Sequence, residues 1–125
     1  MPKPNLNKSL AAAALLIVSG TSMAASGVIA TATVTRVLVD GGPTATNFGG
    51  CMAALSVSPS TILPSCGPNW VTFSCTGSFA TNMMQAYRML DQAQLAMAAN
   101  KQVTVYFRDD QKHNGYCFAN RIDVK

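Results

Sequence analysis

Few residues of this chain could carry acid–base or metal chemistry. Its one histidine is His113, and its five acidic residues are all aspartates. A serine hydrolase needs a buried histidine that a carboxylate orients, but His113 stands between Lys112 and Asn114 in a polar stretch typical of a solvated hairpin turn. Asp109 and Asp110 are adjacent but lack the further oxygen ligands of a calcium loop. We therefore predict no catalytic residue and no metal site, and we expect neither an enzyme nor a bound cofactor.

The four cysteines are the second set of reactive side chains, and they form neither a Cys-x-x-Cys motif nor a zinc-ligand spacing with the histidine. An even number of cysteines in a small chain favours disulfides if the chain enters an oxidising compartment, and the N-terminal segment described next predicts export to one. We therefore expect two disulfides, with no thiol left over as a nucleophile or metal ligand.

Residues 1–24 have the features of a secretory signal peptide. Two lysines precede an apolar run over residues 10–18, and Ser22-Met23-Ala24 has the small-x-small pattern that signal peptidases cleave. The apolar run is shorter than the roughly 20 residues of a membrane-spanning helix. We expect cleavage after Ala24, which leaves Ala25–Lys125 as a single disulfide-stapled domain that is secreted or periplasmic.

Loss of this segment lowers the positive charge of the protein. The full chain has nine lysines and arginines against five acids, a formal net charge of +4. Without Lys3 and Lys8, seven basic residues remain against the same five acids, a net charge of +2. Nucleic-acid binding usually requires a clustered basic stripe. We therefore expect no nucleic-acid partner, and an oligonucleotide-binding protein is the least favoured alternative.

Hydrophobic periodicity predicts the elements that position these side chains. Segments rich in β-branched or alternating apolar residues predict strands over Ala25–Val39, Cys51–Val57, Asn69–Cys75, Gln102–Arg108 and Tyr116–Val124. A helix is predicted over Thr81–Ala99, with Thr81 as its N-cap. Its apolar residues recur at helical spacing and should face the core, namely Phe79, Met83, Ala86, Leu90, Ala93 and Met97.

The predicted order of elements is β-β-β-α-β-β, so the fold is mainly β with one helix. The same order occurs in the OB-fold, a five-stranded Greek-key barrel that binds oligosaccharides and oligonucleotides. We therefore predict an OB-fold-like five-stranded barrel. A four-stranded meander with a packed helix is the structural alternative.

Two segments and a cysteine pair resemble the B subunits of AB5 toxins. They are Met89–Gln94 in the helix, Lys101–Tyr106 in the following strand, and Cys51 with Cys75, which bracket a strand-loop-strand unit. Among these subunits the chain is most similar to the subtilase cytotoxin type, from about Cys51 onward. The resemblance implies a pentameric ring that binds cell-surface glycans and carries a separate catalytic A subunit.

The OB-fold arrangement also predicts a first disulfide. An antiparallel hairpin of the second and third strands would set Cys51 opposite Cys75 and Ala53 opposite Phe73, so that apolar faces match. A slip of one residue would break this match, because it turns every side chain to the other face. We therefore predict the disulfide Cys51–Cys75.

The second disulfide follows from the third and fifth strands, which run parallel in an OB-fold. Cys66 precedes the third strand and Cys117 begins the fifth, so both lie at the same end. A bridge from Cys75 to Cys117 would join opposite ends, beyond the Cα separation of about 7 Å that a disulfide spans. We therefore predict the disulfide Cys66–Cys117.

Outward-facing aromatic and arginine residues are the candidate ligand contacts. In the OB-fold arrangement Trp70 faces outward beside Arg121, and Tyr106 and Arg108 follow on the neighbouring strand. Aromatic rings stack on sugar faces, and arginine pairs with carboxylates such as that of sialic acid. The alternative for Trp70 is packing beneath a loop or at a subunit interface, where tryptophan is enriched.

These features together predict an exported, glycan-binding module of the toxin B-subunit kind. We expect it to form a homo-oligomer, with a cell-surface glycan that can be sialylated as its ligand. The alternative is a stand-alone periplasmic or cell-envelope protein with a structural or interaction role and no toxin partner.

Overall fold

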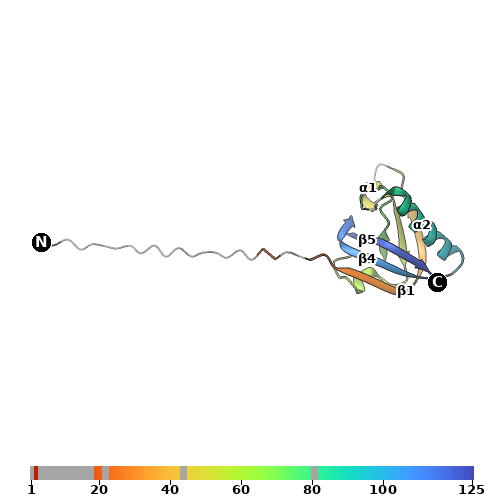
Figure 1. Ribbon diagram of the computed structural model, residues 1–125, viewed down its shortest axis with the longest axis horizontal. Coiled ribbons are helices and arrows are strands. Elements are labelled where there is room, and N and C mark those ends of the chain that lie inside the picture. The colour runs from red at the N-terminus through yellow and green to blue at the C-terminus, as the bar shows by residue number, and fades with distance from the viewer. Residues whose placement is uncertain (1, 3–18, 21–22, 43–44, 80–81) are drawn as a thin grey trace.

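The computed structural model describes residues 2, 19–20, 23–42, 45–79 and 82–125 (Figure 1), so most of the predicted signal peptide lies outside the described residues. The elements are β1 (Ser26–Val39), α1 (Ala45–Phe48), β2 (Cys51–Leu55), a short 3-10 turn (Pro59–Thr61), β3 (Trp70–Thr72), α2 (Met83–Ala98), β4 (Gln102–His113) and β5 (Tyr116–Val124). The predicted order β-β-β-α-β-β is confirmed, with the short helix α1 added between the first two strands, where no helix was predicted.

The five strands form one closed sheet in the order β1-β2-β3-β5-β4. The long strand β1 closes it, because residues 26–33 pair with β4 and residues 34–39 pair with β2. Irregularities in both ladders of β1 allow this change of partner, since bulges bend and twist a strand. Strands β3 and β5 run parallel, as predicted, and pair at Thr72 and Phe118.

The core is made by the inward faces of these strands. Val103, Val105 and Phe107 of β4 are buried at a spacing of two, which is the period of a strand with one face inward. Phe73 contributes the second large aromatic ring, and neither it nor Phe107 is more than 1% exposed. Burial of each ring contributes about 1.5–3 kcal/mol to folding.

Helix α2 packs on this sheet through small residues. Its buried face is Ala86, Leu90, Ala93 and Ala96, and three alanines let the helix axis approach the strands closely. Our predicted stripe was wrong at two positions, because Met83 and Met97 are 55% and 41% exposed.

The ends of α2 explain its length. Asn82 is the N-cap, and its side-chain Oδ1 accepts from the Gln85 N–H at 3.0 Å. The predicted N-cap, Thr81, lies outside the described residues. At the other end Asn100 has a left-handed φ of 51°, and the helix stops there.

Several strand boundaries differ from the prediction. Strand β2 ends at Leu55 and β3 ends at Thr72, so both are shorter than predicted. Strand β4 instead continues to His113, and the polar turn shrinks to Asn114 and Gly115, with φ values of 50° and 84°. Asn-Gly adopts these positive values readily, so it makes a two-residue hairpin turn and lets the strands extend to it.

The predicted register of β2 against β3 was displaced by two residues. Ala53 pairs with Val71, and the Phe73 N–H donates to the Cys51 carbonyl at 3.2 Å. A shift of two residues keeps the same faces inward, so the hydrophobic pattern could not reveal it. Ser74 then adopts a left-handed φ of 57°, which bulges the chain so that Cys75 still reaches Cys51.

Both predicted disulfides are confirmed. Cys51–Cys75 has a Cα separation of 5.6 Å, and Cys66–Cys117 has one of 5.3 Å. Two such bridges are typical of proteins in an oxidising compartment outside the cytosol. Within the described residues, none of the helices has the length and apolar character required to cross a bilayer.

Candidate functional site: a cavity lined by three arginines

A cavity of about 530 Å³ opens between the first half of α2 and strands β4 and β5. Helix α2 supplies two polar side chains and a methionine, the β4–β5 hairpin supplies most of the rest, and one ring comes from the loop before α2. The lining residues are Phe79, Gln85, Arg88, Met89, Arg108, Gln111, Phe118, Asn120, Arg121 and Ile122.

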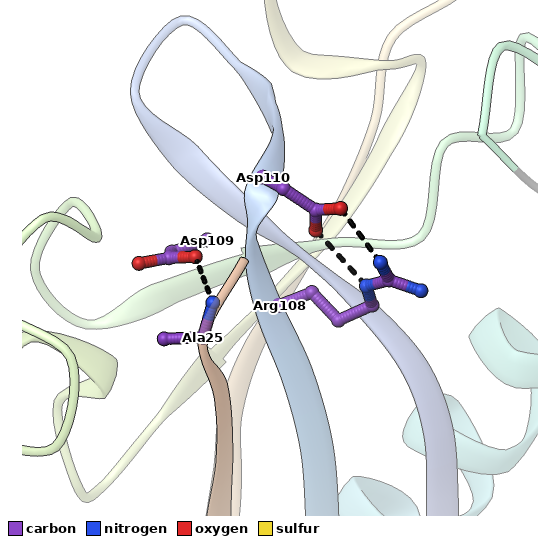
Figure 2. A network of polar contacts seen from close by, with 4 residues as sticks. All are labelled: Ala25, Arg108, Asp109 and Asp110. Carbon is purple, nitrogen blue, oxygen red and sulfur yellow. Dashed lines mark hydrogen bonds and ion pairs between the residues drawn. The ribbon is translucent and has the colours of Figure 1, made fainter. Parts of the chain in front are cut away.

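Alternation along β4 places Arg108 and Asp110 on one side of the strand and Asp109 on the other (Figure 2). Arg108 donates from Nε and Nη2 to the two carboxylate oxygens of Asp110, at 2.9 and 2.6 Å. This hydrogen-bonded pair raises the pKa of Arg108 and lowers that of Asp110. The carboxylate thus fixes the direction of the Arg108 guanidinium at the cavity wall.

Arg121 is held in the same way on β5. Its Nε and Nη2 donate to Asp123 at 2.8 and 2.9 Å, and this pairing raises its pKa. Its guanidinium carbon also lies 4.7 Å from the ring centre of Tyr106, its direct cross-strand neighbour. A cation over an aromatic face is attracted by the ring quadrupole, so two contacts orient this side chain.

The third guanidinium comes from the helix. Gln85 and Arg88 are three residues apart and therefore share one face of α2. Both are exposed, and Arg88 makes no ion pair within the described part of the chain. Three guanidinium groups against two carboxylates leave an excess of positive charge around the cavity.

The floor of the cavity is apolar. The rings of Phe79 and Phe118 lie 5.8 Å apart in a tilted contact, and Met89 and Ile122 pack beside the core. The amides of Gln111 and Asn120 add hydrogen-bonding groups at the wall. An apolar floor with a few convergent polar groups is the usual composition of a small-molecule site.

The structure brings together three of the four predicted ligand contacts. Tyr106, Arg108 and Arg121 share one face of the β4–β5 hairpin. Trp70 does not join them, and the expected proximity to Arg121 was wrong. Because β3 and β5 are parallel and pair at Thr72 and Phe118, Trp70 and Arg121 are offset by about 16 Å along the strands.

Trp70 instead contacts Arg36 of β1, whose guanidinium carbon lies 5.5 Å from the indole ring. Thr72, which strand alternation places on the same face of β3 as Trp70, is fully buried, and its hydroxyl donates to the Phe48 carbonyl of α1 at 2.8 Å. Helix α1 was not predicted, so nothing in the sequence indicated that this face of β3 is covered.

Sequence reasoning missed the surroundings of His113. The residue is half-buried, not solvated, and its Nε2 lies 2.9 Å from the Ser74 Oγ. The same Oγ accepts from the Phe79 N–H at 3.3 Å, and the Phe79 ring stacks on the imidazole at 4.4 Å. A serine beside a histidine is the arrangement of an activated nucleophile, but Ser74 is 0% exposed. In this conformation the pair joins structural elements and presents no hydroxyl to a substrate.

The described residues include no group of three or more His, Cys, Asp or Glu side chains that could hold a metal ion. Comparison of the chain with protein-family models, with curated proteins and with solved structures finds no match.

Proposed function

We propose that this protein is an exported, OB-fold-like binding module that takes a carboxylate-bearing glycan into the cavity between α2 and strands β4 and β5. The observation that carries the proposal is the convergence of three guanidinium groups on one cavity with an aromatic floor. The strand order with parallel β3 and β5 supports the OB-fold assignment.

The three arginines have different roles in this proposal. Arg108 and Arg121 are already paired with aspartates, so they supply oriented N–H groups and positive potential. Arg88 has its fork of donors available for a carboxylate, which a sialic acid provides. The wall amides bind sugar hydroxyls, and the apolar face of the sugar lies on Phe79. Trp70 lies outside the cavity and contacts no part of the same sugar.

The proposed assembly is a homo-oligomer, in line with the resemblance to AB5 toxin B subunits. Helix α2 supports it, because large apolar side chains on its outer side are exposed by 41–63%. They are Met83, Met84, Tyr87, Leu95 and Met97. Contact with a second copy would remove this apolar surface from water. A ring of this kind can carry a separate catalytic A subunit. We propose no nucleic-acid partner.

Calorimetric titration of the processed protein with sialyllactose and with lactose tests the ligand. We expect binding of the sialylated sugar only. Replacement Arg88→Ala should weaken it about tenfold or more, since a charged hydrogen bond contributes about 1.5–3 kcal/mol. The control is Arg36→Ala, which removes an exposed arginine outside the cavity and should leave the dissociation constant unchanged. Equal binding of the two sugars, or equal effects of the two variants, would contradict the proposal.

Light scattering after size exclusion tests the assembly. A pentamer is expected, and Met84→Glu should dissociate it because the glutamate would lose its hydration in the interface. A strict monomer that binds no sugar on a glycan array would overturn both parts. It would favour the stand-alone periplasmic or cell-envelope protein.

A further inference from the structure

The folded domain begins at Ala25, and Asp109 holds it there. The Ala25 N–H donates to Asp109 Oδ1 at 2.7 Å, and the Ala25 carbonyl accepts from the Asp109 backbone N–H at 3.0 Å (Figure 2). The two preceding residues, Met23 and Ala24, are exposed and belong to no strand, and Met23 is 89% exposed. Among the described residues, the first backbone group that the sheet binds is therefore the nitrogen of Ala25.

This nitrogen belongs to the bond that signal peptidase is expected to hydrolyse. The small-x-small motif predicts cleavage after Ala24. Independently of that motif, the hydrogen bond of the Ala25 N–H marks the start of the folded domain at the same peptide bond. Water adds its hydroxyl to the Ala24 carbonyl and a proton to the Ala25 nitrogen. The released α-amino group takes a further proton near neutral pH, because its usual pKa is about 7.7–8.0.

We propose that Asp109 is the receptor for the N-terminal ammonium that export processing creates at Ala25. In the uncleaved chain the contact is a hydrogen bond from a neutral amide to a carboxylate. After cleavage the same nitrogen carries a positive charge at the same place. The contact then becomes a salt bridge, which is shorter and stronger than the neutral bond. This inference does not depend on the ligand proposed for the arginine-lined cavity.

The surroundings of Asp109 suit this role. Its second oxygen, Oδ2, accepts from the Ser65 hydroxyl at 3.1 Å, which fixes the carboxylate in the direction of Ala25. No lysine or arginine forms an ion pair with Asp109 within the described ranges. Its neighbour Asp110 points to the other side of β4 and is neutralised by Arg108 (Figure 2). Among the described residues Asp109 is thus an oriented carboxylate outside the two ion pairs, and cleavage would place a cation beside it.

A small cavity at this place is also changed by processing. It has a volume of about 260 Å³, and its lining includes Met23 and Ala24 together with Ser65, Asp109, Asp110 and Lys112. Lys112 is directed to the Ser65 carbonyl, to which its Nζ donates at 2.8 Å. Cleavage removes Met23 and Ala24 and leaves the new ammonium beside the carboxylate of Asp109. The lining of the cavity then carries three charged side chains, Asp109, Asp110 and Lys112. Of these, Asp109 is hydrogen-bonded to the Ala25 nitrogen, whereas the carboxylate of Asp110 is turned toward Arg108.

The pH dependence of this salt bridge has a defined sign. The negative charge of Asp109 favours the protonated amine, so the folded protein holds the α-amino pKa above its unfolded value of about 7.7–8.0. The stabilisation is complete below that unfolded value. It is lost as the pH rises through the folded pKa. The precursor has no ammonium at Ala25 and lacks this dependence.

The experiment compares the protein that starts at Ala25 with one that starts at Ala24. The extended protein keeps the neutral Ala25 N–H and moves the ammonium by one residue, about 3.3 Å. We expect a higher melting temperature for the Ala25 form at pH 6.5 and equal values at pH 10. In Asp109→Asn the difference at pH 6.5 should vanish, whereas in the matched control Asp110→Asn it should remain.

A second measurement stands even if Asp109→Asn fails to fold. An NMR titration of the Ala25 methyl group in the otherwise unaltered protein should give an α-amino pKa above the usual range. The Ala24 form should give a usual value for its own terminus. Intact mass after export from a bacterial host should show a chain that starts at Ala25. A different start, an unshifted α-amino pKa, or equal melting temperatures at pH 6.5 would each overturn the proposal.

Discussion

The Nε2 of His113 lies 2.9 Å from the Oγ of Ser74, at the point where the chain turns from β3 toward α2. Phe79 contacts both residues, because its N–H donates to the Ser74 Oγ and its ring packs on the His113 imidazole. Phe79 also lines the arginine-rich cavity. This partly buried polar contact therefore joins the tip of the β4–β5 hairpin to the loop that carries Phe79.

Two replacements of Ser74 should distinguish the stability that its hydrogen bonds contribute from the cost of its backbone strain. Ser74→Ala removes the hydroxyl and keeps a left-handed φ of 57°, and we expect a loss of about 1–3 kcal/mol in the free energy of unfolding. Ser74→Gly removes the same hydroxyl but adopts this φ without strain, so it should be less destabilised by about 1 kcal/mol. Urea denaturation of both variants measures the difference. Equal losses would mean that the bend after β3 is unstrained.

Asp110 should titrate at an unusually low pH. The hydrogen bonds from Arg108 hold the pKa of Asp110 below its ordinary value, so the pair contributes stability above the unfolded value of about 3.9. That contribution is lost as the pH falls through the lowered folded pKa. Carbon-detected NMR measures this pKa directly. Arg108→Gln should return it toward its ordinary value, whereas Arg121→Gln, which removes a similar guanidinium on β5, should leave it in place.

The opposite NMR result would also be informative about the cavity. If Asp110 titrates at its ordinary value, Arg108 is not held by it in solution. The Arg108 guanidinium would then be free to turn, and the proposed division of roles between Arg88 and Arg108 would fail.

Removal of either disulfide should destabilise the protein, and loss of the bridge that closes the longer loop of chain should cost more free energy of unfolding. Cys66 and Cys117 are separated by 51 residues, whereas Cys51 and Cys75 are separated by 24. Each bridge contributes about 2–4 kcal/mol, and the chain-entropy account makes the longer one greater by about 0.6 kcal/mol. Denaturation of the two double-alanine variants measures both effects. A peptide that links Cys51 to Cys66 in a non-reducing digest would contradict the pairing itself.

Local sequence patterns predicted the five strands and the long helix, and two of the ten residues that line the cavity, Arg108 and Arg121. Tyr106, Arg108 and Arg121 could be grouped because strand alternation and the Asn-Gly turn fix how two consecutive strands face each other. Arg88 could be placed on the outer side of its helix. The sequence did not indicate that this side borders the β4–β5 hairpin, because that depends on long-range packing of the alanine face of α2.

Several errors around β3 follow from the backbone conformation of Ser74. Ser74 is not a residue type that signals a left-handed bend, since glycine and asparagine usually supply it. The bend ends β3 at Thr72, moves the register by two residues and turns the following loop toward His113. The unrecognised bend at Ser74 therefore hid the contact of this loop with His113, which lies at the end of β4 directly before the Asn114-Gly115 turn.

The position of Gly27 in β1 leaves no room for a larger residue, because the ring of Phe107 lies against it. A Cβ at this position would lie 2.6 Å from the Phe107 Cζ, and that ring is 1% exposed. Gly27 and Phe107 are also cross-strand partners, so the clash lies within the ladder that closes β1 on β4. Gly27→Ala should therefore force the buried ring from its rotamer and lower the free energy of unfolding by about 1–3 kcal/mol.

The control for this prediction is Gly41→Ala, because a Cβ at Gly41 meets nothing within 4 Å. The change at Gly41 should be close to neutral in the same thermal or urea melt. Phe107→Leu, combined with Gly27→Ala, should lose less stability than the sum of the two single changes, since the smaller side chain makes room for the added methyl group. Strict additivity, or a Gly27→Ala variant as stable as Gly41→Ala, would show that the Phe107 ring does not pack over β1. The strand would then not be held against β4 where its first residues approach Asp109.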